Sequence, residues 1–223
     1  TFAFLKNTLA EVMALFPGEY IHIGGDEAPK TQWKTCSHCQ QLISKHNLKD
    51  EQGLQSWFIK EIETFVNSKG KKIIGWDEIL EGGLAPNATI MSWRGTEGAV
   101  EAANAGHDVI LTPTSHAYFD YYQDDHPDEP LAIGGFLPLK KVFEFNPIPT
   151  ELTGDARNHV LGAQGNIWTE YITTEAQVEY MAFPRMLAMA EVVWSGPAEN
   201  NEEAYPMFLS KVVQFMERLE VLG

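Results

Sequence analysis

The chain has 223 residues, of which 44% are hydrophobic and 21% are charged, and its formal net charge is −15. This composition is typical of a globular protein and too apolar for intrinsic disorder. The acidic excess argues against a nucleic-acid partner, because a phosphate backbone attracts clusters of Lys and Arg. No run of about 18 or more apolar residues occurs, so no membrane span is expected.

The spacing of apolar residues predicts helices alternating with short strands. Helices are expected over residues 2–15, 56–66, 97–105, 174–193 and 204–222, with single turns near 79–84 and 138–144. Strands are expected over residues 20–24, 71–76, 89–93, 107–111 and 160–167. Residues 123–149 are acidic and proline-rich, and a loop of this length inside a compact domain is usually functional.

This alternation predicts a parallel sheet with helical crossovers. Several predicted strands end in a polar or aromatic side chain, such as Asp26, Trp76 and Trp93. Functional groups at the carboxyl ends of parallel strands are typical of a (β/α)8 barrel or of a doubly wound sheet. The segment Gly24–Asp26 has neither the G-x-G-x-x-G spacing nor the P-loop lysine of a nucleotide-binding sheet. We therefore predict the α/β class, as part of a TIM (β/α)8 barrel.

The segment His22–Glu27, with the sequence HIGGDE, places Asp26 and Glu27 directly after a predicted buried strand. Neighbouring like charges raise a carboxyl pKa, and a general acid needs such a raised pKa. The alternative is that the acids simply favour the N-terminal dipole of a helix. Adjacent side chains do not easily bracket an anomeric carbon, whereas an ordinary retaining glycosidase needs carboxylates on both sides. A glycosidase built on this pair therefore needs another nucleophile, such as the substrate itself.

Four aromatic residues lie at or near predicted strand ends: Trp76, Trp93, Tyr118 and Trp168. Each alone is readily explained as core, but several on one barrel rim favour carbohydrate binding, because indole faces stack on the apolar faces of sugars. Trp57 and Trp194 lie on helical faces instead, where packing in the core is expected.

Five segments occur in an order and at a spacing that resemble a known family: His22–Glu27, Gly75–Glu78, Met91–Gly95, Tyr118–Asp120 and Gly165–Glu170. They resemble the β-N-acetylhexosaminidases of glycoside hydrolase family 20, over about residues 17–194. The resemblance implies an enzyme that removes terminal non-reducing β-linked N-acetylhexosamine from a glycan partner. It implies no cofactor and no metal, and it suggests an exported protein in the periplasm, at the cell surface or outside the cell.

The resemblance also implies catalytic roles. Glu27 would protonate the glycosidic oxygen and later activate water. Asp26 would orient the substrate's 2-acetamido group, whose carbonyl oxygen attacks the anomeric carbon to give an oxazolinium intermediate with net retention. Tyr118 would hydrogen-bond the acetamido oxygen, and His22 would support the carboxylates. A rival interpretation is a metal-dependent hydrolase that uses His22, Asp26 and Glu27.

The substrate-binding residues implied by the resemblance are Trp76, Trp93, Asp120, Trp168 and Glu170. The three tryptophans would enclose the acetamido methyl group and stack on the sugar ring. Glu170 would bind the C3 or C4 hydroxyl, and Asp120 would bind the C6 hydroxyl.

A second adjacent acidic pair, Asp77–Glu78, is a rival candidate on composition alone. The family places Trp76 against the sugar, so Glu78 is expected to support the site without touching the substrate.

The two cysteines, Cys36 and Cys39, lie three residues apart. Zinc could use both thiolates and His38, but no second pair of ligands at zinc spacing follows in the sequence. A local disulfide and two unreacted thiols remain the other interpretations.

A complete (β/α)8 barrel has eight strands and typically about 250 residues, whereas five strands are predicted here. Residues 1–223 are therefore expected to form one partial catalytic barrel that lacks its first three strands. Open edges are expected at the strands containing Ile21 and Ile167, and they predict a homo-oligomer. The alternative to an active enzyme is a weak or inactive form that still binds N-acetylhexosamine.

Overall fold

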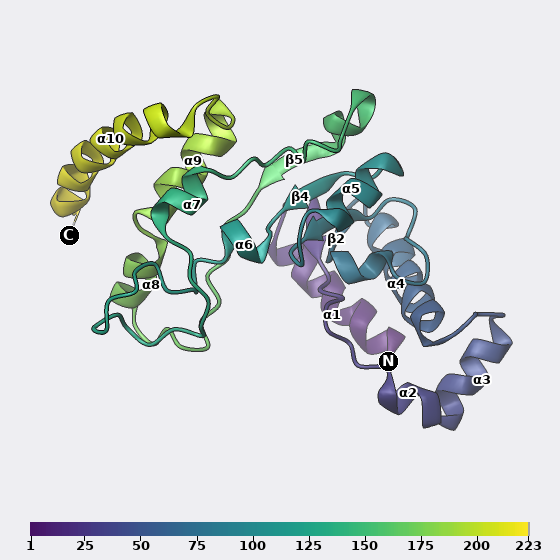
Figure 1. Cartoon of the computed structure of the whole chain (residues 1–223). Helices are drawn as coiled ribbons and strands as arrows, with labels where there is room; N and C mark the ends of the chain where they lie inside the picture. The colour runs from purple at the N-terminus through teal and green to yellow at the C-terminus, as the bar shows by residue number, and fades with distance from the viewer. Residues whose placement is uncertain (223) are drawn as a thin grey trace. The chain divides into compact units, whose positions relative to one another are not determined.

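A computed structural model describes the backbone of residues 1–222 and the side chains of residues 1–219 (Figure 1). The chain divides into two compact units. The first contains residues 1–110 and 152–159, and the second contains residues 111–151 and the chain from residue 160 onward. Within the described residues, no helix is both long and apolar enough to cross a membrane.

The first unit contains most of the strands. Its elements are α1 (Phe2–Leu15), β1 (Tyr20–His22), α2 (Thr31–Thr35), α3 (Ser37–Lys45), α4 (Glu51–Asn67), β2 (Lys72–Trp76), the 3-10 turn η1 (Asp77–Leu80), β3 (Thr89–Ser92), α5 (Glu97–Asn104) and the 3-10 segment η2 (Gly154–His159). Strand β4 (Val109–Leu111) lies at the division between the units.

The second unit is mainly helical. Its elements are α6 (Thr114–Ala117), α7 (Leu139–Phe143), β5 (Val160–Ala163), α8 (Glu175–Ala182), α9 (Arg185–Ser195) and α10 (Asn201–Leu222). The predicted strands and most predicted helices are found within a few residues of their expected bounds, whereas the short helices α2, α3 and α6 were not predicted.

The strands follow chain order in the sheet, β1-β2-β3-β4-β5. Strand β2 pairs in parallel with β1 and with β3, and Ile21 lies opposite Ile73 while Gly75 lies opposite Ile90. Ile73 and Ile90 are fully buried, as is typical of strands in a parallel sheet. The parallel sheet predicted from the alternating pattern is therefore confirmed.

Helix α4 shows why the sequence forms a crossover between β1 and β2 (Figure 1). Its N-cap is Asp50, whose carboxylate accepts a hydrogen bond from the Gly53 amide at 3.0 Å. Ile59, Ile62 and Val66 recur at helical spacing and are buried. Their burial against the sheet supplies the free energy that an isolated helix of this length lacks.

Three details of the prediction are wrong. The single helix expected over residues 174–193 is two helices, because Pro184 has no amide hydrogen to continue α8 and instead serves as the N-cap of α9. The strand expected to reach Ile167 ends at Ala163. Trp194, expected in the core, is 92% exposed.

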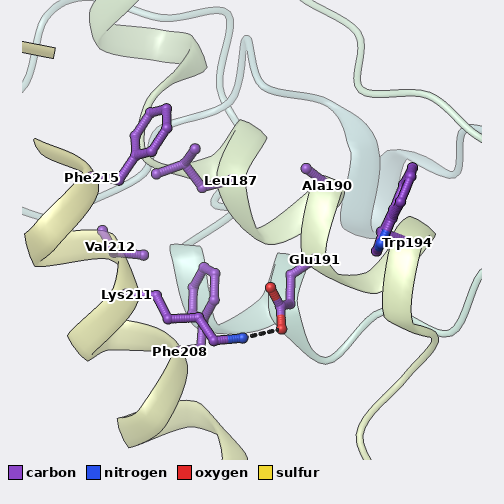
Figure 2. A pocket seen from close by; sticks show the side chains of 8 residues that line it. All are labelled: Leu187, Ala190, Glu191, Trp194, Phe208, Lys211, Val212 and Phe215. Atoms are coloured by element: carbon purple, nitrogen blue, oxygen red, sulfur yellow. Dashed lines mark hydrogen bonds and ion pairs between the residues drawn. The ribbon is translucent and has the colours of Figure 1, made fainter. Parts of the chain in front are cut away.

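The exposure of Trp194 follows from its position on the last turn of α9. Figure 2 shows Trp194 at one end of an open pocket between α9 and α10, with Leu187, Phe208 and Phe215 along its apolar part. An ion pair between Lys211 and Glu191, 2.7 Å long, lies at its polar side. None of the predicted site residues lines this pocket.

The core of the second unit contains a fully buried arginine, Arg185, on the first turn of α9. Its guanidinium donates hydrogen bonds to four backbone carbonyl oxygens, those of Phe119, Tyr121, Leu137 and Met181. Burial lowers the pKa of Arg185 to about 10, which still leaves it charged at neutral pH. This one side chain therefore connects segments that are distant in sequence.

We predict that Arg185→Lys destabilises the protein by about 2–4 kcal/mol, because an ammonium cannot satisfy four dispersed carbonyl oxygens and each unsatisfied buried group costs about 1–3 kcal/mol. The urea midpoint measures the loss. The matched control Arg157→Lys, at an exposed position, should change stability by less than about 0.5 kcal/mol. Equal effects of the two substitutions would contradict the role of Arg185.

Candidate active site

The loop after β1 continues the pairing with β2 beyond the last residue of the strand. The Ile23 amide donates to the Ile74 carbonyl at 2.8 Å, and the Trp76 amide donates to the Gly24 carbonyl at 2.9 Å. The Gln55 side chain of α4 donates to the Gly25 carbonyl at 2.8 Å. These bonds fix the backbone of residues 23–25, which directly precedes the two predicted catalytic carboxylates.

The turn itself requires glycine. Gly24 and Gly25 have φ angles of +72° and +103°. A Cβ atom on Gly25 would lie 2.4 Å from the Ile79 side chain, so any larger residue would displace η1. Asp26 and Glu27 follow with exposed side chains, and Glu27 itself has a left-handed φ of +45°. Such strain in a non-glycine residue is commonly found at functional sites.

His22 contacts the turn and the neighbouring aromatic residue. Its Nδ1 accepts a hydrogen bond from the Gly24 amide at 3.1 Å, and its ring centroid lies 4.8 Å from that of Trp76. Desolvation of the ring lowers the pKa of His22, while the charge of Asp26 opposes this shift. A neutral imidazole that accepts a backbone hydrogen bond fits the supporting role expected from the sequence.

Trp76 and Trp93 come from the ends of the adjacent strands β2 and β3. Trp76 is buried and forms a cluster with Ile74 and Met91, and Trp93 packs against that cluster with its own side chain half-buried. Parallel register places Trp76 beside Met91, so the sheet brings both indoles to one edge.

An acidic network lies directly behind the two tryptophans. The Trp93 indole N–H donates to Glu78 Oε2 at 2.9 Å. The Arg94 side chain bonds Asp77 at 3.1 Å and Glu81 at 2.9 Å, so one guanidinium neutralises neighbouring carboxylates. Burial raises the pKa of Asp77 to about 6, and the Arg94 charge opposes the rise. Glu78 therefore orients an aromatic side chain, as the sequence suggested, whereas the role of Arg94 was not predicted.

The second unit contains the other four predicted site residues: Tyr118, Asp120, Trp168 and Glu170. Backbone hydrogen bonds of 2.7 Å join Phe119 to Asn166 and Asn166 to Ala117, so the segments with Tyr118 and Trp168 run side by side. Burial raises the pKa of Tyr118 to about 12, although hydrogen bonds with Trp168 and Asn166 lower it in part. The phenol is therefore neutral and able to donate a hydrogen bond near neutral pH.

Asp120 is the most unusual of these groups. Its side chain is buried, and Oδ1 has no hydrogen-bond partner within the described part of the chain. Burial raises the pKa of Asp120 to about 6, and the charge of Glu170 raises it further while Arg185 opposes the shift. A buried carboxylate oxygen without a donor is costly, so this atom is suited to accept a ligand hydroxyl.

The structure thus places the predicted residues in two groups. Asp26, Glu27, Trp76 and Trp93 belong to the first unit, and Tyr118, Asp120, Trp168 and Glu170 belong to the second. The sequence analysis did not predict the roles of Arg94 and Arg185. The position of an arginine in the sequence does not show which carbonyl or carboxylate groups its side chain will bond in the folded protein. Among the described residues, no three His, Cys, Asp or Glu side chains form a metal-ligating group.

Comparison with known families identifies the chain. The profile of Glycosyl hydrolase family 20, catalytic domain, matches residues 1–197. The chain belongs to this family. The β-hexosaminidase of Porphyromonas gingivalis is 53% identical over 201 residues, which are 90% of this chain and 26% of that relative. The β-hexosaminidase of Vibrio furnissii is 35% identical over 193 residues, 85% of this chain and 32% of that relative.

Solved structures of the family have the same fold. The GH20 exo-β-N-acetylglucosaminidase of Vibrio harveyi, in complex with N-acetylglucosamine, superposes with a TM-score of 0.88 at 33% identity, over 100% of this chain and 35% of that one. The β-N-acetylhexosaminidase of Bacteroides fragilis gives a TM-score of 0.79 at 32% identity, over 97% of this chain and 44% of that one. The predicted fold class, part of a TIM barrel, is confirmed, and the chain spans less than half the length of these relatives.

For this member of family 20, we predict that Glu78→Ala destabilises the first unit by about 1–3 kcal/mol, because the Trp93 indole N–H loses its buried acceptor. Glu78→Gln keeps an oxygen in the same place and should cost less. Chemical denaturation measures both, with Glu101→Ala at an exposed position of α5 as the control. An equal loss for Ala and Gln would show that the negative charge, and not the acceptor, matters.

Proposed function

We propose that this chain forms the catalytic part of a β-N-acetylhexosaminidase that removes terminal non-reducing β-linked N-acetylhexosamine from glycans. The observation that carries the proposal is the family match together with the exposed Asp26–Glu27 pair, which a glycine turn presents at the carboxyl end of β1. Catalytic groups in TIM barrels lie at that end of the strands. We further propose that residues 1–223 supply one partial barrel, equivalent to the last five of eight βα units.

The proposed mechanism is substrate-assisted and retaining. Glu27 donates a proton to the glycosidic oxygen, and Asp26 accepts a hydrogen bond from the 2-acetamido N–H. The acetamido carbonyl oxygen then attacks the anomeric carbon, the glycosidic bond breaks, and an oxazolinium intermediate forms. Glu27, now a carboxylate, takes a proton from water as the water opens the intermediate. The adjacency of the two acids supports this scheme, because neighbouring side chains act from one side of the sugar and leave the nucleophilic role to the substrate.

The aromatic and polar residues would position the sugar for this attack. A Tyr118 phenol that stays protonated up to about pH 12 can donate to the acetamido oxygen. Trp76, Trp93 and Trp168 would enclose the acetamido methyl group and stack on the ring. Trp168 is 42% exposed, so part of its face is available to a ligand.

Two carboxylates would bind the ring hydroxyls. Asp120 Oδ1, buried and without a donor in the described residues, would accept the C6 hydroxyl. Glu170 would accept the C3 or C4 hydroxyl. A ligand hydroxyl that donates to Asp120 Oδ1 would remove the free-energy cost of this unsatisfied oxygen. An apolar ligand group at the same place would not remove it.

A second candidate function is binding of N-acetylhexosamine without efficient turnover. It is favoured by the buried Asp120 Oδ1, which has no donor among the described residues and can accept a sugar hydroxyl without any chemical step. Parallel measurement of N-acetylglucosamine binding and of aryl N-acetyl-β-glucosaminide hydrolysis separates the two candidates. Binding with no hydrolysis above background would favour the second.

The catalytic assignment predicts that Glu27→Gln and Asp26→Asn differ in substrate dependence. Glu27→Gln should slow an unactivated disaccharide by ~10²–10⁴ but slow an activated aryl glycoside much less, because a good leaving group needs little protonation. Asp26→Asn should slow both substrates and also weaken inhibition by a thiazoline mimic of the oxazolinium intermediate.

Steady-state kinetics on both substrates provides the measurement, and Glu61→Gln, at an exposed position of α4, is the control. Full activity of Glu27→Gln on the unactivated disaccharide would disprove the role of Glu27. Unchanged thiazoline inhibition in Asp26→Asn would disprove the role of Asp26.

We also propose that copies of the chain associate through the outer strands of the sheet, β1 and β5, which are the first and last in its order. Outer strands present backbone groups that can pair with another strand. Sedimentation velocity over a range of protein concentrations should show a concentration-dependent dimer or larger species. A monomer at every concentration would rule the association out.

A further inference from the structure

The two cysteines of the chain occupy a specific place at the start of a helix. Cys36 is the N-cap of the nine-residue helix α3, and its sulfur accepts a hydrogen bond from the Cys39 amide at 3.4 Å. Both thiols are free and half-buried. Nothing in the proposed glycosidase chemistry uses them.

The two thiols differ in their ease of ionisation. A hydrogen bond from the Cys39 thiol, followed by one from the Cys39 amide, lowers the pKa of Cys36. The same thiol–thiol hydrogen bond raises the pKa of Cys39. Cys36 is therefore the better nucleophile near neutral pH, because the thiolate is the reactive form.

The spacing also allows the two sulfurs to bond. Cys36 is the N-cap and Cys39 the third residue of α3. At this separation the Cα atoms lie about 5–6 Å apart, which is within the range that a disulfide spans. The start of α3 is held to the neighbouring helices, because the Gln40 side chain donates to the Trp33 carbonyl of α2 and to the Glu51 carboxylate of α4, both at 2.9 Å. We therefore expect oxidation to leave α2, α3 and α4 in place.

We propose that Cys36 and Cys39 form a thiol–disulfide exchange site for low-molecular-weight disulfides. The Cys36 thiolate attacks one sulfur of the small disulfide, whose S–S bond breaks and releases one thiolate. The Cys39 thiol loses its proton to solvent and attacks the Cys36 sulfur, which releases the second thiolate and leaves a Cys36–Cys39 disulfide. The protein loses two electrons and two protons, and the small disulfide is reduced to two thiols.

The short loop argues for reversible exchange over a structural staple. Only Ser37 and His38 separate the two cysteines. A disulfide that closes so short a loop removes little entropy from the unfolded chain, so it adds little stability. In the sequence, the two cysteines lie between the Asp26–Glu27 turn and α4. The exchange chemistry does not depend on glycosidase activity.

The test uses oxidised glutathione and the full chain, in which these are the only two cysteines. Intact-mass measurement of the wild type should show the loss of two hydrogen atoms and no lasting glutathione adduct. Cys39→Ser should trap a glutathione adduct on Cys36. Cys36→Ser should give a lasting glutathione adduct on Cys39, because no second thiol remains to displace the glutathione.

A second measurement needs no substitution. A limiting amount of iodoacetamide is added to the wild type, and the tryptic peptide of residues 35–45, which contains both cysteines, is sequenced by mass spectrometry. Preferential alkylation of Cys36 is expected. Equal alkylation of the two thiols, or a stable mixed disulfide in the wild type, would overturn the proposal.

Discussion

The pairing of β1 with β2 continues past the end of the strand, and the candidate active site of the first unit depends on this continuation. The Trp76 amide donates a hydrogen bond to the Gly24 carbonyl, so one bond fixes both the turn that precedes Asp26 and the backbone of an indole residue. The turn can approach Ile79 so closely because Gly25 has no Cβ. Backbone geometry, set by two glycines, therefore decides where the carboxylates of Asp26 and Glu27 appear.

In each unit an arginine organises buried polar groups, although Arg94 itself is exposed and Arg185 is buried. Arg94 neutralises the acids behind Trp93, whereas Arg185 donates to four backbone carbonyl oxygens and lies near enough to Asp120 to oppose its raised pKa. Asp77 and Asp120 both have a pKa of about 6, yet their hydrogen bonding differs. Asp77 bonds Arg94, whereas Asp120 Oδ1 has no hydrogen-bond partner among the residues that the structure describes. Asp77 therefore contributes to the fold, whereas the proposed hydroxyl-binding role of Asp120 rests on its unbonded oxygen.

Several elements were predictable because a local pattern decides them. Helix α1 begins and ends where its apolar spacing and Pro17 indicate, and β2 and β3 lie where short apolar runs end in tryptophan. The single helix expected over residues 174–193 is two helices that separate at Pro184. This break could have been predicted, because a proline inside a helical pattern ends or kinks the helix. Trp194 could not be placed from periodicity, because its burial depends on which neighbour covers the last turn of α9.

The sequence by itself determined the parallel α/β class, the family and the candidate residues, because strand periodicity and the five motifs are local properties of the chain. Tertiary structure alone decided which partners those residues meet. It brought Glu78 to the indole of Trp93 and Arg185 to four carbonyl oxygens. Within the described part of the chain, it left Asp120 Oδ1 without a donor. Such contacts join segments far apart in sequence, and the burial that sets their strength and their pKa values exists only after the chain has folded.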